Sequence, residues 1–464
     1  MSIKRLSFRE KLSYGMGDLG NGFMFDMGQL YLLFFYTNYM KISPVIAGSV
    51  FLVAKIADAF IDTAVGAFVD TRVPGKLGKF RPFILFGSFP LAILTTICFV
   101  VPNFGETGRV VWAFATYILF NAAYSIVNIP YGSMSAVMTV DGVERTKLAN
   151  FRSLGSQAAL FFSGIFVYPV VDFIHHHSKN DNLSWAVAIG SMTLLGMIFH
   201  FLCFKGCKER YVAKPKPKTE IISRKDSELN AFMFLCKNKP FIVFVLFTLL
   251  TIATTYIIQQ SQLYYFEYQF NAGKEMMKTI STLNMIAFFP IFFTIAVIVK
   301  KIGKKAAMAI GAIGFGIVQT LNYFLFAENQ IAFLTCMFLS QILIMIPNSV
   351  CWAIVADIVE WGEFISGKRT EGIIYSSYSF TRKVCQAIAG FIPGLILSIV
   401  GFDPDLATQP EGVLAGIKFT YIALPAMLTI IAGIMFIFFY PLTEAKHREI
   451  VEHLGLEKLN TQNS

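Results

Sequence analysis

Charged residues are scarce in this sequence: only 15% of its 464 residues are Asp, Glu, Lys or Arg. A soluble protein carries about a quarter. The seven cysteines show no metal-ligand spacing, and the chain has neither a Walker A pattern nor a small-residue cleavage site near its N-terminus. These absences exclude a soluble enzyme and a secreted disulfide-linked domain. They also predict no cofactor, no nucleotide hydrolysis and no removable signal peptide.

Long apolar blocks take the place of the missing charge. Hydrophobic residues make up 55% of the chain, and 48 residues are Phe. They fall in blocks of about 20 residues, the length that spans a bilayer as a helix. The sequence therefore predicts an all-α membrane protein with twelve transmembrane helices, expected to be a monomer. The blocks lie near residues 14–37, 45–70, 82–102, 110–138, 151–173, 185–204, 241–268, 280–299, 306–326, 331–356, 373–400 and 415–440.

The positive charges prefer one side of these spans. The formal net charge is +10, from 39 Lys and Arg against 29 Asp and Glu. Thirty of the 39 cations fall on the side of the two termini, six on the other side and three inside spans. Since cytoplasmic loops are enriched in Lys and Arg, we expect both termini in the cytoplasm and the chain in a cell (plasma or inner) membrane, with a bacterial source. The scattered excess does not indicate a nucleic-acid partner.

A basic, proline-containing stretch at 205–240 divides the spans into two sets of six. We predict an N-terminal six-helix half at 1–204, a C-terminal half at 241–445 and a cytoplasmic tail at 446–464. A weak repeat supports this division, because GKFR at 78–81 follows the second span and GKK at 303–305 follows the eighth. Two six-helix halves with a substrate site between them are typical of secondary transporters.

Ionisable residues inside spans carry most of the functional information, because each costs at least about 2.5 kcal/mol at the bilayer centre. Lys55, Asp58 and Asp62 lie on one stripe of the second span. Two carboxylates one turn apart suit a Na⁺ site or a proton acceptor. The alternative is a structural Lys–Asp pair with one spare acid. Asp70 continues the stripe at the cytoplasmic end, where a latch between conformations is the favoured interpretation.

Polar residues also mark the first and fourth spans. Asp18 and Asp26 lie in a glycine-rich first span, where Asp18 either contacts sugar hydroxyls or pairs with a basic residue from another helix. Asn121, Tyr124 and Asn128 share one face of the fourth span. Such amides and phenols either bridge helices or bind a polyol.

Further cations flank or enter other spans. Arg152 belongs either to the cytoplasmic loop before the fifth span or to the first turns of that span. Arg382 and Lys383 are adjacent and lie about ten residues into the eleventh span, so they should meet acids of the other half, a carboxylated substrate, or both. His175–His177 is read as a solvated run in an outer loop rather than a metal site.

Eight segments, spread nearly from end to end of the chain, form a recognisable series. They are YGMGDLGNG at 14–22, FLVAKIADAFID at 51–62, GKFRPF at 78–83, YSIVNIPYGS at 124–133, ERTKLANFR at 144–152, VADIVEWGEF at 355–364, RTEGIIYSSYSFTRK at 369–383 and FFYPLT at 438–443. In this order they resemble the glycoside–pentoside–hexuronide:cation symporters, a branch of the major facilitator superfamily. The resemblance looks closer to glucuronide and isoprimeverose carriers than to melibiose carriers.

The resemblance implies a major facilitator fold and uptake of a glycoside with a cation by alternating access. It matches Asp58 and Asp62 to the acids of the family's cation site. The positions that surround sugar and cation in the melibiose carrier correspond to Tyr124, Asn128, Arg152, Ser379 and Lys383.

Three departures from the melibiose carrier change the expectation. Its fourth-span acid is Asn128 here, its first-span sugar-binding Asp is Gly22, and a sugar-stacking Trp is Asn348. One carboxylate fewer favours H⁺ over Na⁺, although both stay open as the coupling ion. Loss of the first-span acid argues against a galactoside bound in the melibiose manner. The basic residues fit an anionic sugar such as a glucuronide, with a neutral xyloside close behind.

The expected partners are a sugar, a coupling cation and the lipid bilayer, and no metal beyond a transported Na⁺ at Asp58 and Asp62. Two alternatives remain: a membrane sugar sensor that does not transport, and a carrier of another anionic amphiphile such as a lysolipid. The predicted cation-binding residues are Asp58, Asp62 and Asn128. The predicted substrate-binding residues are Asp18, Asp26, Tyr124, Asn128, Arg152, Asn348, Ser379, Arg382 and Lys383. The predicted gating residues are Asp70, Arg72, Arg81, Arg145, Asp357 and Arg369.

Overall fold

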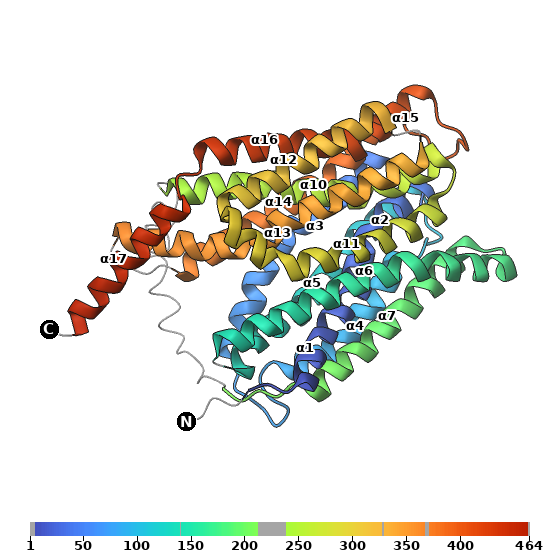
Figure 1. Ribbon diagram of the computed structural model, residues 1–464. Coiled ribbons are helices and arrows are strands. Elements are labelled where there is room, and N and C mark those ends of the chain that lie inside the picture. Colours follow the sequence, from blue (N-terminus) through green and yellow to red (C-terminus); the bar gives the residue numbers. More distant parts are fainter. Residues whose placement is uncertain (1–4, 140, 212–237, 327–328, 367–370, 463–464) are drawn as a thin grey trace. The chain divides into compact units, whose positions relative to one another are not determined.

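The computed structural model describes residues 5–139, 141–211, 238–326, 329–366 and 371–462, and these residues are almost entirely helical (Figure 1). Within them, eleven helices are long and apolar enough to cross a membrane. The first predicted span brings the number to twelve, because α1, η1 and α2 follow one another without a break from residue 8 to residue 38. The prediction of an all-α membrane protein is confirmed.

Among the described residues, most of the helices follow one another through short connections. Three of them contain a π-turn, labelled η1, η2 and η3. In chain order the elements are α1 (Phe8–Asn21), η1 (Gly22–Asp26), α2 (Met27–Asn38), α3 (Pro44–Thr71), α4 (Arg81–Cys98), α5 (Glu106–Met138), α6 (Gly142–Ser178), α7 (Asp181–Gly206), α10 (Lys239–Phe270), α11 (Gly273–Ile302), α12 (Lys304–Leu321), η2 (Asn322–Phe326), α13 (Gln330–Ser366), α14 (Glu371–Ile399), α15 (Glu411–Lys418), η3 (Phe419–Ala423), α16 (Leu424–Phe439) and α17 (Glu444–Gln462).

Helix α6 corrects two expectations about loops. It begins at Gly142, well before the predicted fifth span at 151–173, so Arg152 lies inside the helix and not in a loop before it. The run His175–His177, expected in an outer loop, forms the last turn of the same helix. With 37 residues, α6 is about 55 Å long, well beyond the roughly 30 Å of a hydrocarbon core. Hydropathy marks only the apolar middle of such a helix, so its polar ends were read as loops.

The residues form two compact units by their internal contacts. Unit 1 comprises Met1–Lys218, Gln259–Met285 and Gly390–Ile417. Unit 2 comprises Thr219–Ile258, Ile286–Ala389 and Lys418–Ser464. The division into six-helix halves at the 205–240 linker remains a prediction.

Small residues set the helix packing of unit 1. Helix α1 lies against α6 and α7, α3 lies against α5, and α4 packs on both α5 and α7 (Figure 1). A Cβ atom added at Gly155 of α6 would overlap the Gly15 carbonyl of α1. Paired glycines let two backbones approach closely, which is a common packing device in membranes. The close approach brings the next turn of α1, with Asp18, within reach of Arg152 on α6.

Unit 2 is built on an apolar core in which α12 packs against α13 and α16. Large buried side chains such as Phe247, Ile354 and Phe436 fill this core. The C-terminal helix α17 joins it through Ile450 and Leu454. The helix that follows the last span is therefore packed on unit 2 by apolar contacts.

Candidate functional site

The first polar cluster of unit 1 joins α3 to α5. Lys55 and Asp58 are three residues apart on α3, and Asn121 and Ser125 are four apart on α5, so each pair presents one helical face to the other. The Lys55 ammonium donates to Asn121 Oδ1 at 2.9 Å, and the Ser125 hydroxyl donates to Asp58 Oδ1 at 2.7 Å. Lys55 Nζ lies 3.9 Å from Asp58 Oδ2. We call these four residues the Lys55 cluster.

The Lys55 cluster is nearly sealed from solvent. The side chains of Lys55 and Asp58 are 4% and 5% exposed, and the Phe25 ring centroid lies 4.4 Å from Lys55 Nζ. A buried ammonium and carboxylate require each other and their hydrogen bonds, because an isolated buried charge is strongly unfavourable. The cluster therefore responds strongly to any change in the charge of Asp58.

The other two acids of the predicted α3 stripe differ from Asp58. Asp62 lies one turn further along α3 and is half-buried, whereas Asp58 is buried. Asp70 lies in the last turn of α3, but its side chain is outside the described part of the chain. The assignment of Asp58 and Asp62 as a cation site stays a prediction.

The second polar cluster joins α1 to α6, α5 and α7. The Arg152 guanidinium donates to Asp18 Oδ2 at 2.6 Å and to Asp18 Oδ1 at 3.3 Å. Asn21 donates to Asp18 Oδ1 and to Asn128 Oδ1, both at 3.4 Å, and His200 Nε2 lies 3.2 Å from Asn21 Oδ1. We call these five residues the Arg152 cluster.

The Arg152 cluster is more open than the Lys55 cluster. The Arg152 and Asp18 side chains are 32% and 14% exposed. The Tyr131 and Tyr14 rings lie 4.8 and 5.9 Å from the guanidinium carbon, which holds the cation against aromatic faces. Of the two alternatives for Asp18, the structure shows the pair with a basic residue from another helix.

Two further predicted residues border these clusters. Asp26 Oδ2 accepts a hydrogen bond of 3.2 Å from the Ser156 hydroxyl. The Tyr124 ring stacks on Phe25, with centroids 4.0 Å apart. Phe25 also lies against Lys55, so the same aromatic ring contacts both Tyr124 and the Lys55 ammonium.

Four predicted substrate residues belong to unit 2. Arg382 lies near the rings of Trp352 and Tyr378, at 5.7 and 5.9 Å from their centroids. It makes no ion pair within the described residues, and its neighbour Lys383 is half-buried. Asn348 and Ser379 are exposed.

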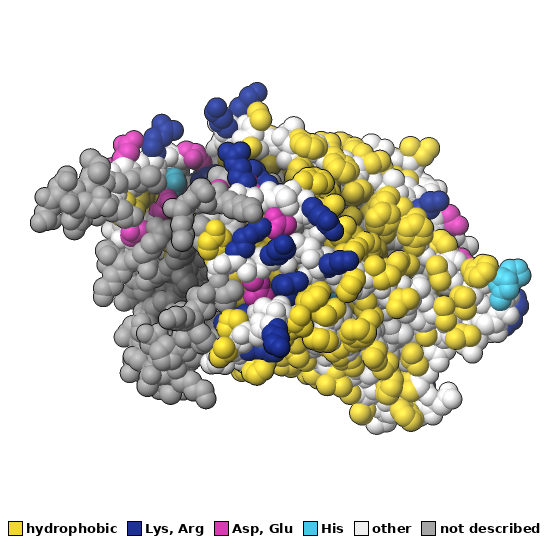
Figure 2. All heavy atoms as spheres, turned by 90° about the horizontal axis from the view of Figure 1, so that it is seen from below, with side chains coloured by type: hydrophobic (Ala, Val, Ile, Leu, Met, Phe, Trp, Pro, Cys, Tyr) yellow, Lys and Arg dark blue, Asp and Glu magenta, His cyan; other side chains and the backbone are white. Residues whose placement is uncertain are grey.

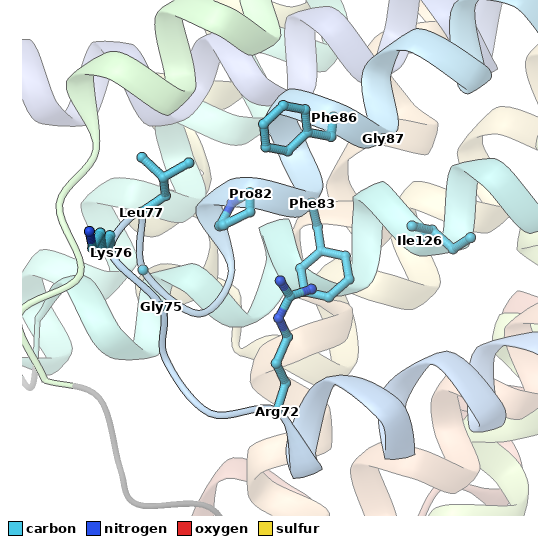
Figure 3. A pocket seen from close by; sticks show the side chains of 10 residues that line it. Arg72, Gly75, Lys76, Leu77, Pro82, Phe83, Phe86, Gly87 and Ile126 are labelled. Atoms are coloured by element: carbon cyan, nitrogen blue, oxygen red, sulfur yellow. The ribbon is translucent and has the colours of Figure 1, made fainter.

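The predicted gating residues of unit 1 make contacts within the unit. The Arg72 guanidinium lies over the Phe83 ring at 4.8 Å (Figure 3). Arg81 donates from Nη2 to the Phe204 carbonyl at 2.7 Å, and Arg145 donates from Nε to the Thr139 carbonyl at 3.0 Å. These contacts tie the ends of neighbouring helices together.

In unit 2, Asp357 binds the Lys304 ammonium through both oxygens, at 2.6 and 2.8 Å. His447 Nε2 on α17 lies 3.3 Å from Asp357 Oδ1 and 2.7 Å from Glu360 Oε2. Asp357, Glu360 and His447 could ligate a metal by distance alone. Lys304 already supplies the positive charge there, so we assign no metal. The last predicted gating residue, Arg369, lies outside the described residues.

The sequence reading missed Asn21, Ser125 and His200 as cluster members. His200 is an ionisable residue within an apolar span, which is the signal that identified the other candidates. Ser125 follows Asn121 by four residues and so shares its face. No sequence feature identified Asn21 as a candidate, apart from its position between Gly20 and Gly22.

A family model described as MFS/sugar transport protein matches residues 13–444 of the chain. The chain belongs to this family. It is thus a transporter and not an enzyme, and its family resemblance is confirmed.

Individual relatives agree with this assignment. The chain is 38% identical to the "Uncharacterized symporter YjmB" of Bacillus subtilis, over 97% of the chain and 96% of the relative. It is 32% identical to the "Glucuronide carrier protein homolog" of Escherichia coli, over 98% and 97% of the two chains. A solved D-xylose-proton symporter has the same fold, with a TM-score of 0.64 at 14% identity, and the match covers 94% of this transporter and 98% of the other. The chain is a multi-pass sugar or glycoside transporter of the major facilitator type.

Proposed function

We propose that the chain is a proton-coupled symporter of an anionic glycoside, with Asp58 as the proton-binding residue. The Lys55 cluster carries this proposal. Asp58 is a buried carboxylate that accepts a hydrogen bond from Ser125 and lies 3.9 Å from the Lys55 ammonium. Its protonation removes the negative charge next to a buried cation, so Lys55 must find new partners and the α3–α5 contact must change. That is the response that coupling requires.

The contacts of the cluster favour H⁺ over Na⁺. A hard cation needs several oxygen ligands with free lone pairs. Asn121 Oδ1 already accepts from Lys55, and Ser125 directs its hydroxyl proton toward Asp58. A sodium ion would also bring a second positive charge next to Lys55. A proton needs only one carboxylate oxygen.

Arg382 supports an anionic substrate. Its described contacts are with aromatic rings, and no carboxylate among the described residues pairs with it. A planar guanidinium forms two parallel hydrogen bonds with a carboxylate. A glucuronide, whose sugar carries such a group, therefore fits this residue better than a neutral xyloside does.

The test measures uptake of a labelled glucuronide by purified protein in proteoliposomes. An inward proton gradient should drive accumulation, whereas a sodium gradient at equal pH should not. Asp58→Asn should abolish accumulation but retain counterflow, and Glu106→Gln, at an exposed acid of α5, should behave as the parent. Accumulation that survives in Asp58→Asn would refute the assignment.

The same assay separates the alternatives. A sugar sensor binds the glucuronide, seen as a thermal shift, but gives no counterflow. A sodium symporter accumulates it only with a sodium gradient. A lysolipid carrier shows no counterflow of the glucuronide and transports a labelled lysolipid instead.

A further inference from the structure

A pocket of about 450 Å³ lies beside the loop that joins α3 to α4. Its wall combines two cations with a large apolar surface, formed by Arg72, Lys76, Leu77, Phe83, Phe86 and Ile126 (Figure 3). None of these residues belongs to the Lys55 or Arg152 cluster. The function proposed above leaves the pocket unexplained.

The two cations of the pocket lack an anionic partner within the described residues. Among the described residues that line the pocket, none is acidic. The Arg72 guanidinium is held by its stacking over Phe83 and forms no hydrogen bond or ion pair with a described residue. All of its N–H donors therefore remain available for an anion.

The acid that lies against this loop, Glu209 after α7, is already engaged. The carboxylate of Glu209 accepts from the backbone N–H groups of Lys79, Phe80 and Arg81, at 2.7, 2.8 and 2.9 Å. The N-terminus of α4 is thus capped from within the chain. This leaves the Arg72 and Lys76 side chains as the groups that a ligand can use.

The apolar wall continues along the surface of unit 1. Phe86, Phe89 and Ile93 follow one face of α4 and are 58%, 51% and 59% exposed. On α5, Ile126 and Leu119 are 39% and 55% exposed. Exposed apolar residues along a membrane-spanning helix face acyl chains. On the surface seen in Figure 2, Lys and Arg side chains gather beside such an apolar surface.

We propose that this pocket binds the headgroup of an anionic glycerophospholipid, with the phosphate at Arg72 and Lys76 and an acyl chain along Phe86 and Ile126. Basic pockets at the ends of transmembrane helices are suited to such headgroups. Two cations, with no acid among the described lining residues, select a net negative headgroup over a zwitterionic one. The apolar wall favours a lipid over a soluble phosphate.

The test is a titration of the full-length purified protein in detergent, with bound lipid counted by native mass spectrometry. The probes are phosphatidylglycerol, phosphatidylcholine with the same chains, and glycerol 3-phosphate. Arg72→Gln/Lys76→Gln should raise the Kd for phosphatidylglycerol about thirtyfold, at roughly 1 kcal/mol per cation. Lys300→Gln/Lys301→Gln, which removes two exposed cations of α11, should leave that Kd unchanged.

A second variant tests the apolar part of the pocket. Phe86→Ala/Ile126→Ala should weaken phosphatidylglycerol binding and leave the weak binding of glycerol 3-phosphate as it is. Three results would overturn the proposal: equal losses in the two charge variants, equal affinity of the parent protein for both lipids, or glycerol 3-phosphate binding as tightly as the lipid. The comparison of phosphatidylglycerol with phosphatidylcholine uses only the parent protein. It therefore decides the proposal even if a variant fails to fold.

Discussion

The two polar clusters of unit 1 solve the problem of charge inside a membrane in different ways. In the Lys55 cluster, the cation and the acid are about 95% buried, stand 3.9 Å apart and are each hydrogen-bonded to a neutral side chain of α5. In the Arg152 cluster, the cation and the acid contact each other through two hydrogen bonds and keep partial access to solvent. The first arrangement holds its charges apart and relies on neutral partners, whereas the second is a direct ion pair between two helices.

The largest expected effect comes from breaking the Lys55 cluster at its acid. Asp58→Leu removes the carboxylate beside a buried ammonium, which costs about 3–5 kcal/mol when one partner of a buried pair is lost. The apparent melting temperature of the purified protein, followed by fluorescence, should fall sharply. Lys55→Met/Asp58→Leu, which removes both charges, should recover most of the loss. Equal melting temperatures for the single and double variants would contradict this account of the pair.

The next effect concerns the Arg152 cluster. Arg152→Gln removes a charge-assisted bidentate contact with Asp18, and such hydrogen bonds contribute about 1.5–3 kcal/mol. Because the pair is partly exposed, we expect the lower end of that range. A double-mutant cycle with Asp18→Asn, read by thermal unfolding, should give a coupling energy of about 1 kcal/mol. A coupling near zero would mean that the two side chains act independently.

A smaller effect is expected when a neutral partner of the Lys55 cluster is changed. Ser125→Ala removes one 2.7 Å hydrogen bond to Asp58 and should cost about 1 kcal/mol, or about fivefold in the coupling equilibrium. The measurement is the apparent melting temperature of the purified protein, which should fall because the buried Asp58 carboxylate loses a hydrogen-bond donor. Ser133→Ala is the matched control on α5, since its hydroxyl donates to the Ile129 carbonyl of its own helix.

The smallest effect is expected next to the Arg152 cluster. Ser156→Ala removes a longer hydrogen bond, 3.2 Å, to Asp26, and should cost about 0.5 kcal/mol, seen as a small fall in melting temperature. Ser153→Ala, at an exposed serine on the same helix, serves as its control. A change as large as that of Ser125→Ala would show that Asp26 depends on its hydroxyl partner as strongly as Asp58 does.

The sequence predicted well which residues lie in membrane spans, but it predicted poorly which side chains contact one another across helices. Hydropathy located Lys55, Asp58 and Asp18 in spans, because their cost in a bilayer makes them conspicuous. It could not tell whether Asp18 pairs with a cation, since that depends on how closely α1 approaches α6 at Gly15 and Gly155. Partners on other helices leave no periodic signal in either sequence.

Neutral partners were harder still to predict. Ser125 and Asn21 are ordinary residues in membrane helices, and only tertiary packing gives them an ionic neighbour. The role of Glu209 was not predicted for another reason. Its role is to accept from three backbone N–H groups of a loop about 130 residues earlier, and no sequence pattern encodes such a backbone contact.

The π-turn in the first span has a consequence for the history of the chain. The Met27 N–H donates to the Gly22 carbonyl, five residues back, where an α-helix would use the fourth. Such a turn is what one inserted residue produces in an existing helix. It rotates the side chains that follow it about the helix axis relative to those that precede it.

Asp18 lies before this turn and Asp26 at its end, so a one-residue deletion between them would preserve both acids and the apolar character of the span. It would nevertheless point one of them away from its present neighbours. In this stretch a deletion is therefore a larger change than most substitutions, and relatives that differ here in length should differ in which of the two acids keeps its present neighbours.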